Sequence, residues 1–352
     1  MNAYLKNWQV VSLSVTADIR TAMEKLDQVA LQIVLVVDAE DKLLGTITDG
    51  DIRRGLLVGK GLDASVAEII NDSPMVGFDF ESEIAWHRKM QRKLLRHLPI
   101  VDESDRVIGL FHQKRADQRL SNPVVLMLGG LGTRLRPLTE TIPKPMLKVG
   151  NRPILETILT HIADQGFEEF YFCINYLGDQ IREYFGDGSR FGVKIHYIEE
   201  NDRMGTAGAL SLIKESFDQP FVVMNGDLLT KIDLGAMLDF HEMNQNKITA
   251  GVREYSQQVP YGVVEIEGQQ VTQLVEKPIY RYFVNGGIYM LSAECLQQIP
   301  KDAFYDMTTL IEETLADHGK VGAFPITEYW MDIGQIPDYN QAQHDYLIHF
   351  HS

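Results

Sequence analysis

The residues best suited to chemistry in this chain are a group of closely spaced glycines followed by two cations. Gly129, Gly130 and Gly132 directly follow an apolar run, and Arg134 and Lys144 lie within the next twelve residues. Glycines spaced in this way allow the backbone to approach a ligand and to turn its N–H groups toward it. Lys144 lies between two prolines, which restrict its backbone and fix where its amine points. The segment is therefore interpreted as a binding site for phosphate.

Two other glycine-loop chemistries fit this segment less well. A triphosphate loop of the Walker type requires Lys-Ser or Lys-Thr after its last glycine, and the segment has neither. A dinucleotide loop runs straight into a helix, which Pro137 would interrupt. The acidic residue that such a loop needs about 20 positions on would be Glu156, but the cations before it contradict a ribose-binding role. A glycine turn with incidental cations is the remaining alternative.

A carboxylate suited to a metal ion follows a second apolar run. Residues 221–224 are apolar and lead through Asn225 and Gly226 to Asp227. In open α/β sheets, ligands bind at the carboxyl ends of the strands. Mg²⁺ prefers oxygen ligands and keeps several waters. Asp227 is therefore a candidate Mg²⁺ ligand, the alternative being a solvated aspartate that caps the next turn.

The elements that position these residues belong to the second of two predicted domains. The polar stretch that ends at Pro123 places a boundary near residues 119–123, since the residue before a proline avoids helical conformation. The apolar run 124–128 is typical of a buried parallel strand. A helix over residues 336–350 is expected to close the domain. The predicted domains are residues 1–120, divided at about 62/63, and residues 123–352.

Length and charge exclude several classes of protein. The 352 residues are 45% hydrophobic and 23% charged, which predicts a folded chain of two or three domains. Lys and Arg number 33 and Asp and Glu 49, a net charge of −16, so non-specific binding to nucleic acid is not expected. No apolar run is long enough to span a membrane. The two cysteines are too few for a disulfide scaffold, and a cytoplasmic location is expected.

An internal repeat occupies the first third of the chain. Residues 34–51 and 98–115 each read as a strand, an acidic turn, a second strand with a glycine, and a polar helix start. Gly45 and Gly109 correspond at an offset of 64 residues. Amphipathic helices are predicted before each copy, over 19–31 and 84–95. Two copies of a unit of about 60 residues predict a pseudo-twofold pair.

This repeat resembles the CBS family, whose paired modules bind adenosine nucleotides. The family's ligand motif corresponds to Gly45, Ile47, Thr48 and Asp51 in the first copy. The helix start would meet a phosphate, and the carboxylate of Asp51 would accept the ribose hydroxyls. The second copy has His112 and Arg115 at the positions of Thr48 and Asp51, so at most one adenosine site is expected. The alternative is a pair that binds nothing and only mediates dimerisation.

The glycine segment is part of a longer and more specific pattern. Gly-Gly-x-Gly-Thr-Arg-Leu-x-Pro-Leu-Thr, with Pro-Lys-Pro downstream, resembles the signature of the sugar-1-phosphate nucleotidyltransferases, or sugar-nucleotide pyrophosphorylases. The family usually has Ala where this chain has Leu128. Later segments resemble the family's in the same order, at 200–210, 261–264, 275–278, 285–289 and 329–334.

The resemblance implies a role for each matching residue. Three cations act on the phosphates: Arg134, Lys144 and Lys277. The nucleotide is held by Leu128, Gly129, Gly130, Gly132, Thr133, Gly205, Thr206 and Ala207. The sugar is held by Gly262, Glu276 and Asn285, and Mg²⁺ by Asp227 and Asp332. The alternative for the segment 200–210 is an ordinary helix start with Thr206 as its cap.

The two resemblances together imply a fold and a reaction. The fold class is α/β: a CBS pair, which is an α+β tandem repeat, followed by a Rossmann-like nucleotidyltransferase domain with a mixed, mostly parallel sheet. The reaction joins a nucleoside triphosphate, with GTP preferred, to a sugar 1-phosphate and releases pyrophosphate (EC 2.7.7). The layout resembles guanylyltransferases of bacterial nonulosonic acid pathways, which act on glucosamine 1-phosphate. Adenine nucleotides would regulate the enzyme, and the CBS pair would make it a homo-oligomer.

Two alternatives to this function stay open. The chain could carry out the same chemistry with UTP or CTP, whose enzymes have similar base-recognition loops. It could also be a catalytically silent regulatory subunit that senses adenylate, although the residues expected for catalysis are all present. A nicotinamide dehydrogenase is disfavoured by the cations next to its would-be ribose carboxylate.

Overall fold

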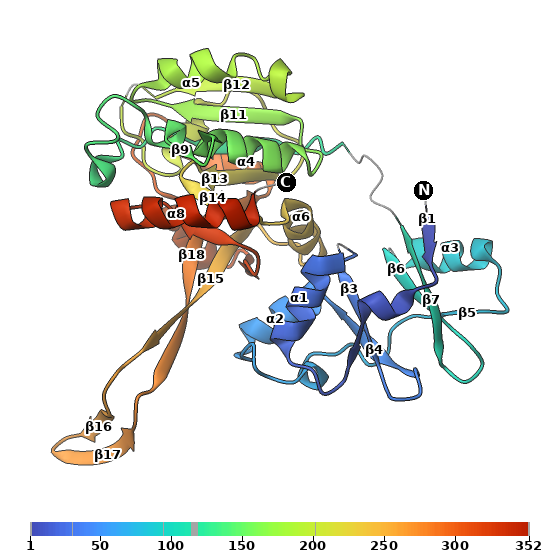
Figure 1. The fold of residues 1–352 in the computed structure, drawn as a ribbon. Helices are drawn as coiled ribbons and strands as arrows, with labels where there is room; N and C mark the ends of the chain where they lie inside the picture. Colours follow the sequence, from blue (N-terminus) through green and yellow to red (C-terminus); the bar gives the residue numbers. More distant parts are fainter. Residues whose placement is uncertain (1, 30, 94, 114–118, 201, 351–352) are drawn as a thin grey trace. The chain divides into compact units, whose positions relative to one another are not determined.

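The chain divides into two compact units, Met1–Gln118 and Arg119–Ser352, in the computed structural model (Figure 1). The structure describes residues 2–29, 31–93, 95–113, 119–200 and 202–350. Each unit has hydrophobic core clusters of its own. Among the helices of these described residues, none combines the length and the apolar character needed to cross a bilayer.

The N-terminal unit contains two copies of one strand arrangement. In the first copy β2 is parallel to β3, which is antiparallel to β4; in the second copy β5, β6 and β7 repeat this pattern. Strand β1 adds to β7 in antiparallel orientation. The strands are β1 Asn2–Leu5, β2 Ser12–Ser14, β3 Ile33–Val37, β4 Leu43–Thr48, β5 Gly77–Phe78, β6 His97–Val101 and β7 Val107–Gln113.

The strand register repeats with the offset found in the sequence. Val36 lies opposite Gly45, and Ile100 lies opposite Gly109, each 64 residues later, and the register shifts after both pairs. Packing requires both glycines: a Cβ at Gly45 would lie 2.4 Å from the backbone oxygen of Asn71, and one at Gly109 would lie 2.3 Å from a tyrosine hydroxyl. The predicted internal repeat is confirmed.

The helices of this unit occupy equivalent places in the two copies. Helix α1 (Ile19–Val29) precedes β3 and helix α3 (Glu83–Arg92) precedes β6, as predicted to within three residues. Helix α2 (Asp49–Leu57) follows β4. A core cluster containing Leu35 of the first copy and Leu110 of the second joins the two copies into one unit.

The C-terminal unit is built on a seven-stranded sheet with the order β12-β11-β8-β13-β18-β15-β19. Strands β12, β11, β8 and β13 are parallel neighbours, as are β15 and β19, whereas β18 is antiparallel to both β13 and β15. The strands are β8 Val124–Met127, β11 Glu169–Ile174, β12 Lys194–Glu199, β13 Phe221–Asn225, β15 Ile248–Gln258, β18 Ile279–Leu291 and β19 Val321–Pro325. The predicted mixed, mostly parallel sheet is confirmed.

Both faces of this sheet are covered by helices. Val124 and Leu126 face a core cluster that includes residues of α4, α5, α6 and α8, and Val125 faces a second cluster that includes residues of α7. An apolar run without alternation is thus buried on both sides, as in other parallel sheets. The helices are α4 Ile154–Ala163, α5 Gly178–Phe185, α6 Leu234–Met243, α7 Met307–Ala316 and α8 Ile336–His349, the last matching the predicted tail helix.

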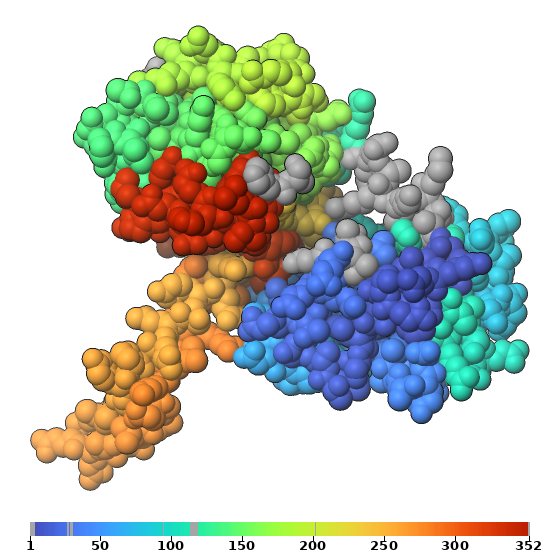
Figure 2. Space-filling view, viewed as in Figure 1, coloured from blue at the N-terminus to red at the C-terminus, as the bar shows by residue number. Residues whose placement is uncertain are grey.

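Two strands of the sheet continue beyond it as a long ribbon. The outer parts of β15 and β18 stay paired from Val252 and Asn285 to Gln258 and Ile279. A hairpin of β16 (Val263–Glu267) and β17 (Gln270–Val275) lies at the far end. Residues 252–285 are here called the arm. In Figures 1 and 2 the arm, coloured orange, projects away from the sheet and the helices of its own unit.

Candidate active site

The glycine loop begins where the central strand β8 ends. Gly132 has a φ of 60°, in the left-handed region, and its carbonyl accepts a hydrogen bond of 2.7 Å from the Thr139 hydroxyl. A Cβ at Gly132 would lie 2.9 Å from Thr139 and 3.2 Å from Lys144. The loop therefore closes on itself and packs directly against the segment that carries Lys144.

Lys144 meets a carboxylate from a distant part of the sequence. It lies in the single turn η4 (Lys144–Met146) and is 8% exposed. Its Nζ forms an ion pair with Oδ2 of Asp227, which follows β13. Strand β13 is the parallel neighbour of β8, so the two loops leave the same edge of the sheet. Parallel pairing thus brings together two residues that are 83 positions apart.

The second predicted metal carboxylate joins this pair through a short ladder. Strand β14 (Leu228–Thr230) pairs with β20 (Trp330–Asp332), so that Leu228 lies opposite Asp332. Desolvation of the Asp332 carboxyl group and the charge of Asp227 raise its pKa, while Lys144 and Arg134 act in the opposite direction. Arg134 is close enough that a Cβ at Gly334 would lie 3.8 Å from both its Nη1 and the Asp332 Oδ1. Two carboxylates and two cations therefore surround one space.

The two carboxylates fit a divalent cation. Asp227 Oδ1 is buried and accepts no hydrogen bond from the described part of the chain. A buried carboxylate oxygen is destabilising unless a donor or a cation satisfies it. Mg²⁺ takes oxygen ligands and keeps several waters, so two protein carboxylates are an adequate contribution. The described residues contain no group of three or more His, Cys, Asp or Glu that could hold a metal.

The segment that resembles the family's base-recognition loop, within residues 200–210, is attached to the start of helix α7. The Thr206 backbone N–H donates to Asp306 Oδ1 at 2.9 Å, and the Thr206 hydroxyl accepts from the Met307 backbone N–H at 2.9 Å. Gly205 has a φ of 80°, and a Cβ there would lie 2.6 Å from the backbone oxygen of Tyr305. Thr206 therefore caps helix α7, whose first residue lies 101 positions later in the chain. It does not cap the short 3-10 helix that follows it (Gly208–Leu212), which the alternative interpretation expected. Ala207 is buried beside it, and position 201 lies outside the described residues.

The predicted sugar-binding residues fall in two places. Asn285 lies at the base of the arm, where its Oδ1 accepts from the Gly287 backbone N–H at 3.0 Å. Gly262 and Glu276 lie at the far end and face each other, since a Cβ at Gly262 would lie 2.9 Å from Glu276 Oε2. Lys277 is next to them, with its backbone N–H donating to the Tyr261 carbonyl at 3.3 Å. The structure therefore does not bring Lys277 together with the cations and carboxylates of its own unit, and the roles of these four residues stay predictions.

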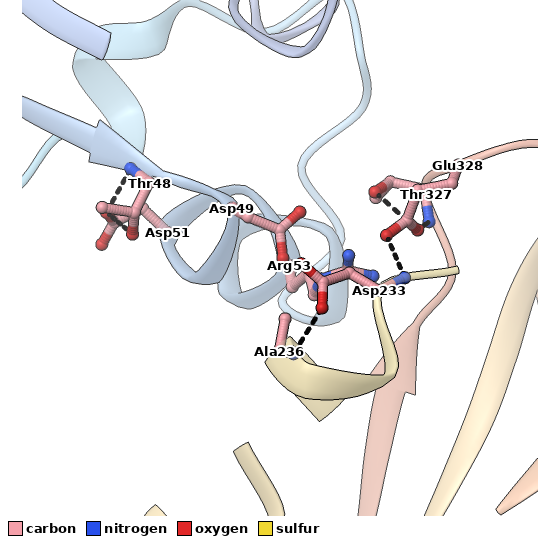
Figure 3. A network of polar contacts seen from close by, with 8 residues as sticks. All are labelled: Thr48, Asp49, Asp51, Arg53, Asp233, Ala236, Thr327 and Glu328. Atoms are coloured by element: carbon pink, nitrogen blue, oxygen red, sulfur yellow. Dashed lines mark hydrogen bonds and ion pairs between the residues drawn. The ribbon is translucent and has the colours of Figure 1, made fainter. Parts of the chain in front are cut away.

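The predicted regulatory residues form a helix cap. Asp51 Oδ2 accepts from the Thr48 backbone N–H at 2.8 Å and from its hydroxyl at 2.6 Å, at the start of α2 (Figure 3). Asp51 Oδ1 pairs with Arg54 Nη2 at 2.5 Å. In the second copy His112 is buried at the end of β7, and Arg115 lies outside the described residues. A ribose at Asp51 would have to displace Arg54, whose side chain is 65% exposed.

Two residues that shape the site, Thr139 and Glu200, were not singled out from the sequence, and Leu128 has a structural role beside its predicted one. Thr139 belongs to the quoted motif, but only its bond to Gly132 shows that it fixes the loop. The carboxyl group of Glu200, whose pKa burial raises, lies against Gly129, where a Cβ would be 2.8 Å from its Oε1. Leu128 is 2% exposed and packs over Gly226, so it supports the strand end before Asp227. Its predicted contact with the nucleoside stays a prediction.

Known protein families match both parts of the chain. A model of the nucleotidyl transferase family matches residues 123–348, and a model of the CBS domain matches residues 5–58 and 66–120. The first of these matches covers more than half of the chain.

Individual relatives resemble the C-terminal unit. A UTP--glucose-1-phosphate uridylyltransferase of Synechocystis sp. is 33% identical over 238 residues, which are 62% of this chain and 61% of the relative. A probable mannose-1-phosphate guanylyltransferase 1 of Oryza sativa subsp. japonica is 32% identical over 63% of this chain and 64% of the relative. A D-glycero-alpha-D-manno-heptose 1-phosphate guanylyltransferase of Campylobacter jejuni is 30% identical over 61% of this chain and 96% of the relative. The chain thus spans less than two thirds of the first two relatives.

A solved structure also resembles this unit. The crystal structure of HddC from Yersinia pseudotuberculosis matches with a TM-score of 0.50 and 29% identity, covering 64% of this chain and 99% of HddC.

Proposed function

The chain belongs to the nucleotidyl transferase family, and from that premise we propose that it joins a nucleoside triphosphate to a sugar 1-phosphate. The products are a nucleoside-diphosphate sugar and pyrophosphate. The observation that carries the proposal is the ion pair between Lys144 and Asp227, with Asp332 and Arg134 beside it. It supports the proposal because cations are groups suited to phosphates and carboxylates are groups suited to Mg²⁺, and here the two kinds lie together.

The proposed reaction is an in-line transfer. An oxygen of the sugar 1-phosphate forms a bond to the α-phosphorus of the triphosphate, the bond from that phosphorus to the β-bridging oxygen breaks, and pyrophosphate leaves. The attacking phosphate is already anionic at pH 7, so the step needs no general base. Catalysis then depends on alignment and on neutralising charge.

Each charged residue has a place in this proposal. Arg134 would stabilise the departing pyrophosphate, Lys144 the α-phosphate and Lys277 the incoming sugar phosphate. Because an ammonium group has three donors, Lys144 can keep its contact with Asp227 while it donates to a phosphate oxygen. Asp227 and Asp332 would hold Mg²⁺, which when bound supplies positive charge that neutralises the triphosphate. The glycine loop and the loop at Gly205, Thr206 and Ala207 would hold the nucleotide.

GTP is the proposed triphosphate. Two of the relatives above are named as guanylyltransferases, of mannose 1-phosphate and of a heptose 1-phosphate, whereas the Synechocystis relative is named as using UTP. Glucosamine 1-phosphate is the proposed sugar, on the resemblance of the two-part layout alone. Regulation by an adenine nucleotide at Thr48 and Asp51 and a cytoplasmic location are further parts of the proposal.

A matrix of four nucleoside triphosphates against several sugar 1-phosphates, with Mg²⁺ and a pyrophosphate-release assay, tests this function. We expect turnover to be highest with GTP, and to fall on the order of 10²–10³-fold in Lys144→Ala and in Asp227→Asn. Lys148→Ala, an exposed lysine four residues from Lys144, is the matched control and should keep the wild-type rate.

Two results would contradict the proposal. Near-normal turnover in both Lys144→Ala and Asp227→Asn would remove the mechanism. No turnover with any pair of substrates, in a folded protein that still binds adenine nucleotide, would instead favour the silent regulatory subunit.

A further inference from the structure

The exposed large apolar side chains of the described residues are concentrated in the arm. Of the 25 large apolar side chains that are more than a third exposed in the described residues, twelve lie within residues 255–284. Tyr261 is 74% exposed, and Ile266 and Leu274 are each 66% exposed. Together the twelve present on the order of 1,000 Å² of surface, which is comparable to the roughly 800 Å² that each partner contributes to a standard protein interface.

The architecture of the arm also requires a partner surface. A two-stranded ribbon is only marginally stable in water unless a face of it packs against something else. The hairpin of β16 and β17 is a separate two-stranded sheet, and both of its strands are exposed along nearly their whole length. Large exposed apolar patches of this kind mark interaction sites. Figure 2 shows the arm standing clear of the body of its own unit.

The arm carries predicted substrate residues away from the catalytic centre of its own chain. Asn285 stays near that centre. Its hydrogen-bond partner Gly287 lies against Asn225, since a Cβ at Gly287 would be 2.7 Å from the side-chain amide nitrogen of Asn225. Six residues of continuous ladder separate Asn285 from Ile279, a span of roughly 20 Å. Glu276 and Lys277 lie still further out. While β15 and β18 stay paired along the arm, Lys277 is held away from Asp227 of the same chain. The site at Asp227 then lacks the cation proposed for the sugar phosphate.

We infer that the arm of one chain packs on a second copy of this chain and completes the catalytic centre of that copy. The inference rests on the proposed function, because it assigns Lys277 and Glu276 to the sugar phosphate and the sugar. The far end of the arm carries the cation proposed for the sugar phosphate. A second copy offers a centre for the triphosphate that lacks this cation, so the two complement each other. In a two-fold dimer each chain gives its arm and receives one, so both sites are completed and both apolar surfaces are covered.

Complementation between two defective full-length chains tests the inference. One chain carries Asp227→Asn and keeps a normal arm; the other carries Lys277→Ala and keeps normal carboxylates. The two are co-expressed with different tags and purified through both, and pyrophosphate release is measured. If arms act between chains, one of the two sites in each mixed dimer has all its residues, and about half of the wild-type rate returns.

Mixed oligomers of two differently tagged Asp227→Asn chains are the control and should stay at the rate of that variant. A mixed Asp227→Asn and Lys277→Ala preparation that is no faster than its parents would overturn the inference, since each arm would then serve its own chain or no site.

Sedimentation separates failure of this inference from failure of the proposed function. Leu274→Asp places a charge on the arm, and Met243→Asp places one at an apolar residue of α6 that is 82% exposed. We expect Leu274→Asp to lower the molar mass of the assembly and Met243→Asp to leave it at the wild-type value. This result would support the arm as a contact between copies even if the wild type turned over no substrate. If the mass is unchanged in Leu274→Asp and the mixed Asp227→Asn and Lys277→Ala preparation is also no faster than its parents, the contact is overturned. The second condition is needed because pairing of the N-terminal repeats could by itself hold two chains together.

Discussion

At the scale of single residues, the three glycines of the glycine loop, Gly129, Gly130 and Gly132, have different reasons to be glycine. Gly129 faces Glu200, and Gly132 combines a left-handed φ with contacts to Thr139 and Lys144. Gly130 differs from both, because a Cβ there would meet no atom of the described chain within 4 Å, and its φ is not left-handed. Any requirement for glycine at position 130 must therefore come from a ligand, which is consistent with a phosphate passing over this residue.

Gly130→Ala and Gly132→Ala separate the ligand from the fold. We expect Gly130→Ala to keep the wild-type melting temperature but to raise KM for the nucleotide at least about tenfold, because the methyl group occupies space that the triphosphate needs. Gly132→Ala should lower the free energy of unfolding by about 1 kcal/mol or more, since alanine is strained at positive φ. Differential scanning fluorimetry and initial rates measure the two effects. Normal nucleotide kinetics in Gly130→Ala would show that no phosphate lies over this residue.

At the scale of elements, the site depends on how loops and helices are held to the sheet. Helix α6 is attached through His241, whose two ring nitrogens lie 3.0 Å from the Thr249 hydroxyl and 3.2 Å from the Ser292 hydroxyl. Thr249 belongs to β15 and Ser292 follows β18, so this histidine ties α6 to the two strands that continue into the arm. His241 is 2% exposed, and burial lowers its pKa to about 4.

This histidine should make the stability of the protein depend on pH. In the folded chain His241 stays neutral down to a pKa of about 4, whereas in the unfolded chain it takes up a proton near pH 6.5. The unfolded state then binds more protons between these values, so the free energy of unfolding falls as pH drops through that window. We expect His241 to account for a loss of about 2 kcal/mol between pH 7.5 and pH 5.

Urea unfolding of the wild type and of His241→Gln at the two pH values isolates this contribution. His97 in the N-terminal unit also has its pKa lowered to about 4 by burial, so the wild type should lose stability from more than one group. The variant should lose about 2 kcal/mol less than the wild type over the same interval. Equal losses in the two proteins would show that His241 is not a buried neutral histidine.

At the scale of the whole molecule, the proposed regulation requires a ligand bound to the N-terminal unit to change the activity of the C-terminal unit. Coupling of this kind is a shift in a conformational equilibrium, and it requires a ligand that distinguishes two states. Asp51 is the residue to test, because both of its carboxylate oxygens are engaged, one by Thr48 and one by Arg54. A bound ribose would exchange the Arg54 contact for its hydroxyls and leave the helix cap in place.

Titration of adenine nucleotides against turnover and against melting temperature tests the regulatory role. We expect both quantities to change in the wild type and neither to respond in Asp51→Asn, which should also lose about 1 kcal/mol of stability because the capping box is weakened. Asp72→Asn, at an exposed aspartate of the same unit, is the control and should respond as the wild type does. No response in the wild type would reduce the repeat to an assembly device.

The sequence alone determined the parts of this protein that depend on local pattern. The offset of 64 residues predicted two equivalent strand registers, and the apolar run before Gly129 predicted a central parallel strand. The structure contains both the repeated register and the central strand. An apolar run next to a glycine turn can be buried in few arrangements, so the local pattern is enough to predict them. It also brings Lys144, Asp227 and Asp332 to one edge of the sheet, as the order of the motifs implied.

Only the tertiary structure decided what depends on pairing between distant segments. No local pattern shows that Thr206 caps α7 or that Thr139 closes the loop at Gly132, because each partner is set by how the chain folds back. The path of the arm is the largest such feature: alternation along β15 and β18 predicts strands but does not say where they leave the sheet. The physical reason is that strand pairing fixes direction through backbone hydrogen bonds, which carry no signature in the side chains.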